Sequence, residues 1–307
     1  MSRNCRLRIV NSCLAASVLL LIACSFSLKM ANAQANEFSR ACPFDGKTLQ
    51  FAGAPNEQAR CLLRRIGIQG EVGQSLLKLP APLAKLIGEP VKITRENLRS
   101  FLKAENIDQS KLGGSLDLPL STAKLPTGEQ IQALYFIIHD TSDPYLKDAP
   151  FPDEINDAQW NGNNLEKWLK LPVAHVFVNR VGDSITVTNF AETVSQGWGT
   201  KLARDFLKAD GKGLQLHIEL VQPRRRDPNR APLETNDSIA PKPGFSEKQY
   251  ERLALLYVCA SVRRGSWLIP AFHAAVDAGI KDAHDDPQNF DLKMWTEKLD
   301  RLIKQIK

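Results

Sequence analysis

The chain has 307 residues, of which 43% are hydrophobic, enough for one large domain or for a medium-sized domain with an extension. Its formal charge of +6 depends on the first 33 residues, which hold four basic residues and no acidic one. The remaining 36 basic and 34 acidic residues nearly balance, so the charge gives no reason to expect a nucleic-acid partner.

The N-terminus has the layout of an export signal. A basic segment, residues 3–8, precedes an apolar stretch, residues 14–22, which is too short to span a membrane. We therefore predict that residues 1–33 are a signal peptide and that the protein is exported to the periplasm.

Two cleavage sites compete within this signal. An Ala-x-Ala site at residues 31–33 would release a soluble protein that starts at Gln34. The segment 21–24 resembles a bacterial lipobox, which would place a lipid on Cys24 and make the protein an outer-membrane lipoprotein. That lipid is the one membrane attachment expected, because no later segment is apolar enough to cross a bilayer.

Export also changes how the cysteines are interpreted. An oxidising compartment favours a disulfide between Cys42 and Cys61, which would close a loop of about 20 residues and add roughly 3 kcal/mol of stability. Cys259 lies in an apolar helical stretch and is predicted to be a buried, unreactive thiol. No Cys-x-x-Cys pair is present, so a zinc ribbon is not supported.

Residues 34–125 are predicted to form a mostly helical N-terminal extension. Residues 57–66 have the pattern of a short amphipathic helix, and Thr94 is a suitable N-cap for a helix over residues 95–104. Residues 113–128 are rich in Gly, Ser and Pro, which indicates a linker or an arm that wraps around the rest of the protein.

Residues 126–307 are predicted to form the second part of the chain. Residues 133–139 and 214–221 are nearly continuous apolar runs, which are typical of central buried strands. Residues 174–189 predict a hairpin around a Val-Gly-Asp turn.

Two helices follow these strands. Ser246 and Gln249 form a capping box, and Phe245 and Tyr250 are spaced as a hydrophobic staple, so a helix is expected to begin there. A second helix is expected over residues 292–306. Strands interleaved with helices predict an α/β fold with a mixed central β-sheet flanked by helices.

A basic run lies between the last predicted strand and these helices. Residues 223–244 contain five prolines and are expected to be irregular. The three arginines at 224–226 are predicted to lie in a solvated loop, because basic runs in loops usually face water. Contact with an anionic polymer is the alternative.

Four polar residues carry the chemistry. His139 ends the first apolar run, Glu219 lies near the end of the second, and His273 and Asp286 follow downstream. Two imidazoles and a carboxylate can hold Zn²⁺ and leave its fourth position open for water. A nearby glutamate can then take a proton from that water, which is the outline of a hydrolase site.

Four segments, in this order, resemble the zinc-dependent N-acetylmuramoyl-L-alanine amidases of the type 2 amidase, or peptidoglycan-recognition-protein, family. They are Phe-Ile-Ile-His-Asp-Thr-Ser at 136–142, the hairpin at 174–185, Leu-His-Ile-Glu-Leu at 216–220, and the Phe-His to Asp-Pro segment at 272–287. The resemblance covers residues 131–295, approximately, and implies that residues 126–307 form an amidase-like catalytic domain.

This resemblance implies roles for five residues. His139, His273 and Asp286 would be the zinc ligands and Glu219 the catalytic base. His284 would stand where the family usually has a lysine that stabilises the oxyanion. The implied reaction is hydrolysis of the amide between N-acetylmuramic acid and L-alanine, with peptidoglycan or a muropeptide as the partner.

The final segment departs from the family pattern. The family has Asp-Pro-Gly, whereas Gln288 follows Pro here, and the spacing from His273 to Asp286 is slightly long. Lys281 is an alternative to His284 for the oxyanion, and His284 could itself be a ligand.

Three further residues have side chains that could lie near the site. For His175, a place near the substrate and a structural hydrogen bond both remain open. His217 shares a strand face with Glu219, but the family pattern gives it no catalytic role, so it is left out. Trp198, in a Gly-rich loop, is the best candidate for stacking on a sugar.

Two other functions remain possible from the sequence. Several proteins of this family bind muropeptides without cleaving them, usually after losing a ligand, so a non-catalytic peptidoglycan-binding module is the main alternative. An amidase acting on another N-acyl amino acid or peptide is the weaker one.

Overall fold

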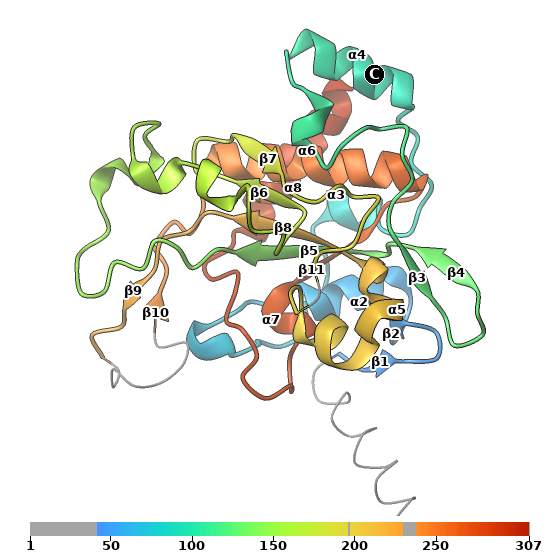
Figure 1. Ribbon diagram of the computed structural model, residues 1–307, viewed down its shortest axis with the longest axis horizontal. Helices are drawn as coiled ribbons and strands as arrows, with labels where there is room; N and C mark the ends of the chain where they lie inside the picture. Colours follow the sequence, from blue (N-terminus) through green and yellow to red (C-terminus); the bar gives the residue numbers. More distant parts are fainter. Residues whose placement is uncertain (1–41, 196, 230–237, 307) are drawn as a thin grey trace, which may run out of the picture.

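A five-stranded mixed β-sheet forms the centre of the protein (Figure 1). The structure, a computed structural model, describes residues 42–195, 197–229 and 238–306. The strand order is β11-β5-β8-β6-β7, and every strand is parallel to its neighbour except β7. The strands are β5 (Tyr135–Asp140), β6 (Val176–Val178), β7 (Ser184–Thr186), β8 (Gln215–Leu220) and β11 (Ile269–Phe272).

The two central strands, β5 and β8, could be predicted from their apolar sequences, which arise because both of their faces are covered. Residues 135–138 of β5 are fully buried, and β8 is buried along nearly its whole length. A parallel strand buried on both faces has a continuous apolar sequence. The predicted hairpin is confirmed as β6 and β7. The edge strand β11 was not predicted, since it has four residues and contains Pro270, which is compatible with an edge position.

Helices cover both faces of the sheet, which confirms the predicted α/β class. Phe136 contacts Tyr257 of α6 (Glu247–Arg264), with ring centroids 5.3 Å apart. On the other face, the Tyr135 hydroxyl donates to Gln58 Oε1 of α2 (Pro55–Leu62) at 2.7 Å. Figure 1 shows α6 and α8 (Leu292–Gln305) on one side and α2 and α7 (His273–Val276) on the other.

Helix α6 begins where its sequence predicts. The capping box of Ser246 and Gln249 is present, and the Phe245 and Tyr250 rings lie 6.0 Å apart, as expected for the staple. The helix ends at Gly265, whose φ of 83° lies in the left-handed region that glycine adopts without strain. Cys259 is a buried free thiol, as predicted, and burial raises its pKa to about 12.

The N-terminal part packs against the sheet and shares its hydrophobic core. Thr94 is confirmed as the N-cap of α4 (Arg95–Ala104). The helix predicted over residues 57–66 ends earlier, at Leu62, because Ile66 pairs with Val72 in a short β-bridge.

Residues 113–128, expected to be a linker or a wrapping arm, contact helix α6 at their start. The buried Arg263 guanidinium donates to the carbonyl oxygens of Gly113, Leu118 and Pro119, so one side chain of α6 holds the start of this arm.

The remaining elements are short. The strands are β1 (Phe44–Asp45), β2 (Gln50–Phe51), β3 (Thr122–Lys124), β4 (Gln130–Gln132), β9 (Arg225–Arg226) and β10 (Ser238–Ile239). The helices are α3 (Ala81–Ala84), α5 (Lys208–Gly211), the π-helix η6 (Leu202–Leu207) and the 3₁₀ turns η1 (Ile68–Gly70), η2 (Gln109–Lys111), η3 (Asp153–Asn156), η4 (Asn161–Asn163), η5 (Glu166–Trp168) and η7 (Lys212–Leu214).

The predicted signal peptide, residues 1–33, and its alternative lipid site at Cys24 lie outside the described residues. Among the residues that are described, no helix combines the length and the apolar composition needed to cross a bilayer.

The predicted disulfide is confirmed between Cys42 and Cys61. Replacing both with Ala should lower the free energy of unfolding by about 3 kcal/mol, because the unfolded chain then regains the entropy of a loop of about 20 residues. Urea unfolding followed by tryptophan fluorescence measures the change. Reducing the wild type with a thiol should lower it equally, and an unchanged transition in both experiments would contradict the expected contribution.

Candidate metal centre

The register of the parallel strands brings three of the predicted residues together. His139 of β5 is paired with Glu219 of β8. On the other side of β5, Phe272 of β11 is paired with Ile138, so His273, the next residue, falls beside His139. These residues end their strands at the carboxyl edge of the sheet, where ligands bind in open α/β folds.

Asp286 completes a group that could hold a metal ion. One ligand atom from each of His139, His273 and Asp286 lies within 4.8 Å of the others, and all three residues are buried. The two Nδ1 atoms are 2.9 Å apart. Asp286 Oδ2 lies 3.6 Å from His139 Nδ1 and 3.2 Å from His273 Nδ1.

The pKa values of the two imidazoles in this group are shifted in opposite directions. Burial alone would lower the pKa of His273, but the carboxylates of Asp286 and Asp277 raise it well above its usual value. Burial and the neighbouring His273 and His217 lower the pKa of His139 well below its usual value. The neutral imidazole, which is the form that binds metals, is favoured at His139, whereas the surrounding carboxylates favour positive charge at His273.

Glu219 has a free oxygen close to this group. Its Oε1 lies 3.8 Å from His139 Nδ1, and its Oε2 is buried with no hydrogen-bond partner among the residues that the structure describes. Burial and the Asp286 carboxylate raise the pKa of Glu219 well above its usual value. A carboxyl group held in this way can accept a proton and return it near neutral pH.

His284 lies beside the group at the solvent side. Its ring stacks on that of His273 at 4.7 Å, its Nδ1 is 3.8 Å from Asp286 Oδ1, and 57% of its side chain is exposed. His284 is not one of the three residues whose ligand atoms converge. Lys281 is also exposed, and its carbonyl oxygen accepts a hydrogen bond from Lys201 Nζ.

Two residues that the sequence interpretation left out contact the predicted ligands. His139 Nε2 lies 2.9 Å from His217 Nδ1, and His273 Nε2 lies 2.9 Å from Asp277 Oδ2. Such partners fix the tautomer and orientation of metal-binding imidazoles, here with Nδ1 toward the group. The signals were the shared strand face of His217 and Glu219, and the four-residue spacing of His273 and Asp277.

Asp277 also holds the start of η6. Its carboxylate accepts hydrogen bonds from the backbone N–H groups of Lys201 and Leu202 at 2.8 and 2.9 Å. One side chain therefore joins the imidazole of His273 to a separate segment of the chain.

His175 makes structural hydrogen bonds. Its Nδ1 accepts from the backbone N–H of His217 at 2.9 Å, and its Nε2 lies 3.1 Å from the carbonyl oxygen of Glu192. The structure therefore agrees with the structural alternative for this residue. Trp198 is 53% exposed, and its role as a sugar-stacking residue stays a prediction.

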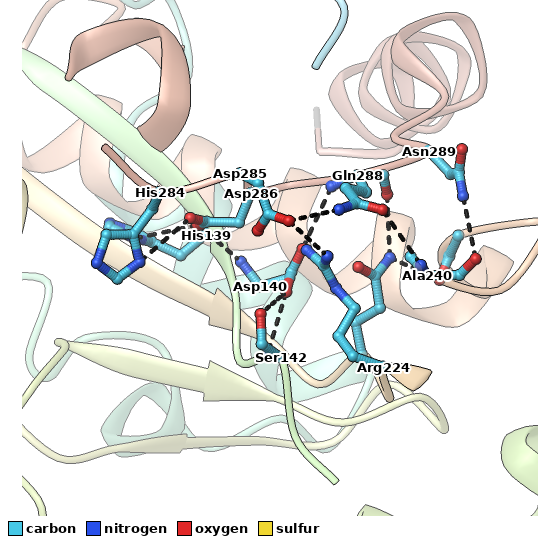
Figure 2. A network of polar contacts seen from close by, with 12 residues as sticks. His139, Asp140, Ser142, Arg224, Ala240, His284, Asp285, Asp286, Gln288 and Asn289 are labelled. Carbon is cyan, nitrogen blue, oxygen red and sulfur yellow. Dashed lines mark hydrogen bonds and ion pairs between the residues drawn. The ribbon is translucent and has the colours of Figure 1, made fainter. Parts of the chain in front are cut away.

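The prediction of a solvated loop at residues 224–226 is wrong for its first member. The Arg224 side chain is fully buried and pairs with Asp140 Oδ2 at 2.7 Å and Asp285 Oδ2 at 3.2 Å (Figure 2). Two buried carboxylates supply the counter-charge that lets an arginine leave water. Arg225 and Arg226 are half-buried in β9.

Comparison with known protein families gave no match, and no curated protein matched the chain. A solved structure described as the crystal structure of a selenomethionine AmpD derivative is similar over 61% of this chain and 97% of its own, with 17% identity and a TM-score of 0.33. A likeness of this strength carries no conclusion about the chain.

The position of Glu219 predicts a stability cost in the metal-free protein. Because the folded protein raises the pKa of Glu219, folding favours the protonated carboxyl group. The wild type therefore has its full stability below the unfolded pKa of 4.5 and loses stability as the pH rises toward the folded pKa. Glu219→Gln removes the buried charge. We expect the metal-free variant to gain about 1 kcal/mol over the wild type at neutral pH, and nothing at low pH.

Thermal unfolding of both proteins in chelator across pH measures this difference. The exposed Glu129→Gln is the control and should show no such pH-dependent gain. A wild type that is as stable as Glu219→Gln at every pH would contradict the cost assigned to the buried carboxylate.

Proposed function

We propose that this protein is a zinc-dependent hydrolase that cleaves the amide bond between N-acetylmuramic acid and L-alanine in peptidoglycan. The observation that carries the hydrolytic part is the buried group of His139, His273 and Asp286 with Glu219 beside it, whose Oε2 has no hydrogen-bond partner within the described part of the chain. The choice of bond and substrate rests on the resemblance of the four sequence segments that contain these residues.

Zinc fits the donors. Two imidazoles and one carboxylate form a ligand set typical of catalytic zinc sites. In a tetrahedral zinc site the ligand atoms are about 3.3 Å apart, given zinc–ligand bonds of about 2.0–2.1 Å. The three separations here, 2.9, 3.2 and 3.6 Å, bracket that value. When bound, Zn²⁺ would supply Lewis acidity that polarises the substrate carbonyl and acidifies a water molecule.

The chain's own residues would supply the proton transfers. Glu219 would accept a proton from the attacking water through its free Oε2 and pass it to the nitrogen of the leaving amine. His217 and Asp277 would keep the Nε2–H tautomers of His139 and His273, so that both Nδ1 lone pairs remain available.

His284 is the candidate for stabilising negative charge on the carbonyl oxygen. It is the half-exposed side chain that stacks on His273, so it can reach a substrate that approaches from solvent. Either its protonated form or a neutral N–H group can donate a hydrogen bond to an oxyanion.

We further propose that the protein acts outside the cytoplasm, after export directed by residues 1–33. Peptidoglycan or a muropeptide would be its partner, and the balanced charge gives no role to nucleic acid. Membrane attachment would depend on a lipid at Cys24.

A peptidoglycan-binding module without activity is the second candidate. It is favoured by the altered final segment, where His284 and Gln288 replace the residues usual in the family. Both candidates allow zinc, but a binder has no need of Glu219. An amidase acting on another N-acyl amino acid or peptide would keep Glu219 and differ in substrate.

Release of free stem peptide from purified sacculi by the zinc-loaded protein tests the proposal. We expect Glu219→Gln to lower kcat at least about 100-fold while keeping its zinc, because a general base contributes about 10²–10⁴-fold. His139→Ala should lose both zinc and activity. Retention of sacculi without release, equal in wild type and Glu219→Gln, would support the binding module instead.

The same assay separates His284 from Lys281. His284→Ala should lower kcat about 10²–10³-fold with little change in KM, since a donor to the oxyanion acts mainly in the transition state. Lys281→Ala is the matched control and should keep wild-type kcat. The reverse result would give the oxyanion role to Lys281.

A further inference from the structure

The Arg224 side chain joins two segments that carry candidate ligands: the end of β5, with His139, and the final loop, with Asp286. Its Nη2 donates to Asp140 Oδ2 at 2.7 Å and its Nη1 to Asp285 Oδ2 at 3.2 Å. Asp140 directly follows His139, and Asp285 directly precedes Asp286. One buried guanidinium therefore binds the neighbours of two ligands that lie 147 positions apart (Figure 2).

We propose that Arg224 is a positioning residue for the metal centre, which holds the carboxylate of Asp286 in place against the imidazoles of His139 and His273. The proposal rests on the metal site of the proposed function and is independent of which amide is cleaved. The Arg224 guanidinium pairs with Asp140 and Asp285, the neighbours of the ligands, so it acts through these two carboxylates.

The path from Arg224 to Asp286 through Asp140 is short. Asp140 Oδ1 accepts from the backbone N–H and the hydroxyl of Ser142 at 2.9 and 3.0 Å, while its Oδ2 accepts from Arg224 and from the backbone N–H of Gln288. These contacts fix the end of β5. The backbone N–H of Asp140 then donates to Asp286 Oδ2 at 3.2 Å. A hydrogen bond of this kind orients a metal-binding carboxylate.

The second path runs through the loop itself. Gln288 Nε2 donates to Asp285 Oδ2 at 2.6 Å, and Gln288 Oε1 accepts from the backbone N–H of Ala240 at 3.2 Å. The residue that departs from the Asp-Pro-Gly pattern of the resembled family is thus a member of the Arg224 network. Arg224 and Gln288 together clamp Asp285 on the same oxygen, next to the ligand.

The positions of Asp140 and Asp285 suit an arginine better than a lysine. A guanidinium presents several N–H donors in one plane and can bind two carboxylates at once, which the single ammonium group of lysine does less well. Removing the arginine alone would leave Asp140 and Asp285 buried without a counter-ion and would destabilise the fold. A test of positioning must therefore separate stability from metal binding.

Two variants achieve this separation. Arg224→Lys keeps the charge but loses the fixed geometry. The triple variant Arg224→Met, Asp140→Asn, Asp285→Asn removes all three charges together, and replacing a buried ion network as a unit is often tolerated. Arg226→Met is the matched control, because Arg226 lies two residues on and pairs with the exposed Asp148.

The readouts are the dissociation constant for Zn²⁺, measured by competition with a chelator, and the visible spectrum of the Co²⁺-loaded protein, which reports ligand geometry. Circular dichroism and thermal unfolding establish that each variant is folded. We expect Zn²⁺ binding to weaken about 10–100-fold in Arg224→Lys and in the triple variant, with an altered Co²⁺ spectrum. Arg226→Met should match the wild type in both.

Wild-type Zn²⁺ affinity and an unchanged Co²⁺ spectrum in folded Arg224→Lys or in the folded triple variant would overturn the proposal and assign Arg224 to folding alone. A wild type that binds neither ion would overturn both this proposal and the metal-dependent function. Metal binding that depends on Arg224, in a protein that releases no stem peptide, would support the positioning role and remove only the proposed activity.

Discussion

The parallel pairing of β5 with β8 and β11 is the constraint on which the site depends. It sets His139 opposite Glu219 and brings His273 alongside, although these residues are far apart in sequence. Because side chains alternate along a strand, a shift of one residue in either pairing would turn one of them to the other face of the sheet. The apolar runs that bury both faces of β5 and β8 are what make such a shift costly.

The second organising feature is the excess of buried negative charge at this edge of the sheet. Asp140 and Asp285 share one arginine, Arg224, and Asp277 shares the imidazole of His273 with Asp286. Burial raises the pKa of Asp285 to about 6, even though Arg224 opposes this. The carboxylates of Asp286 and Asp277 raise the pKa of His273 against the effect of its burial, so this edge of the sheet favours a further positive charge.

Sequence patterns predicted the elements whose signals are local. The apolar runs of β5 and β8 and the capping box of α6 depend on neighbouring residues, and the α/β class followed from them. The burial of Arg224 and the edge strand β11 were missed. Arg224 is buried because carboxylates from two distant segments pair with it. A basic run near prolines contains no local pattern that predicts these partners. Long-range partners of this kind exist only after the chain has folded.

The carboxylate of Asp277 has a consequence for motion as well as for structure. It receives hydrogen bonds from His273 and from the first residues of the segment that leads into η6, which follows the loop bearing the exposed Trp198. The metal centre and this segment therefore share one acceptor, the Asp277 carboxylate, and thermodynamic linkage between them is reciprocal. If metal binding orders this segment, then a ligand that orders the segment must raise the affinity for the metal by the same factor.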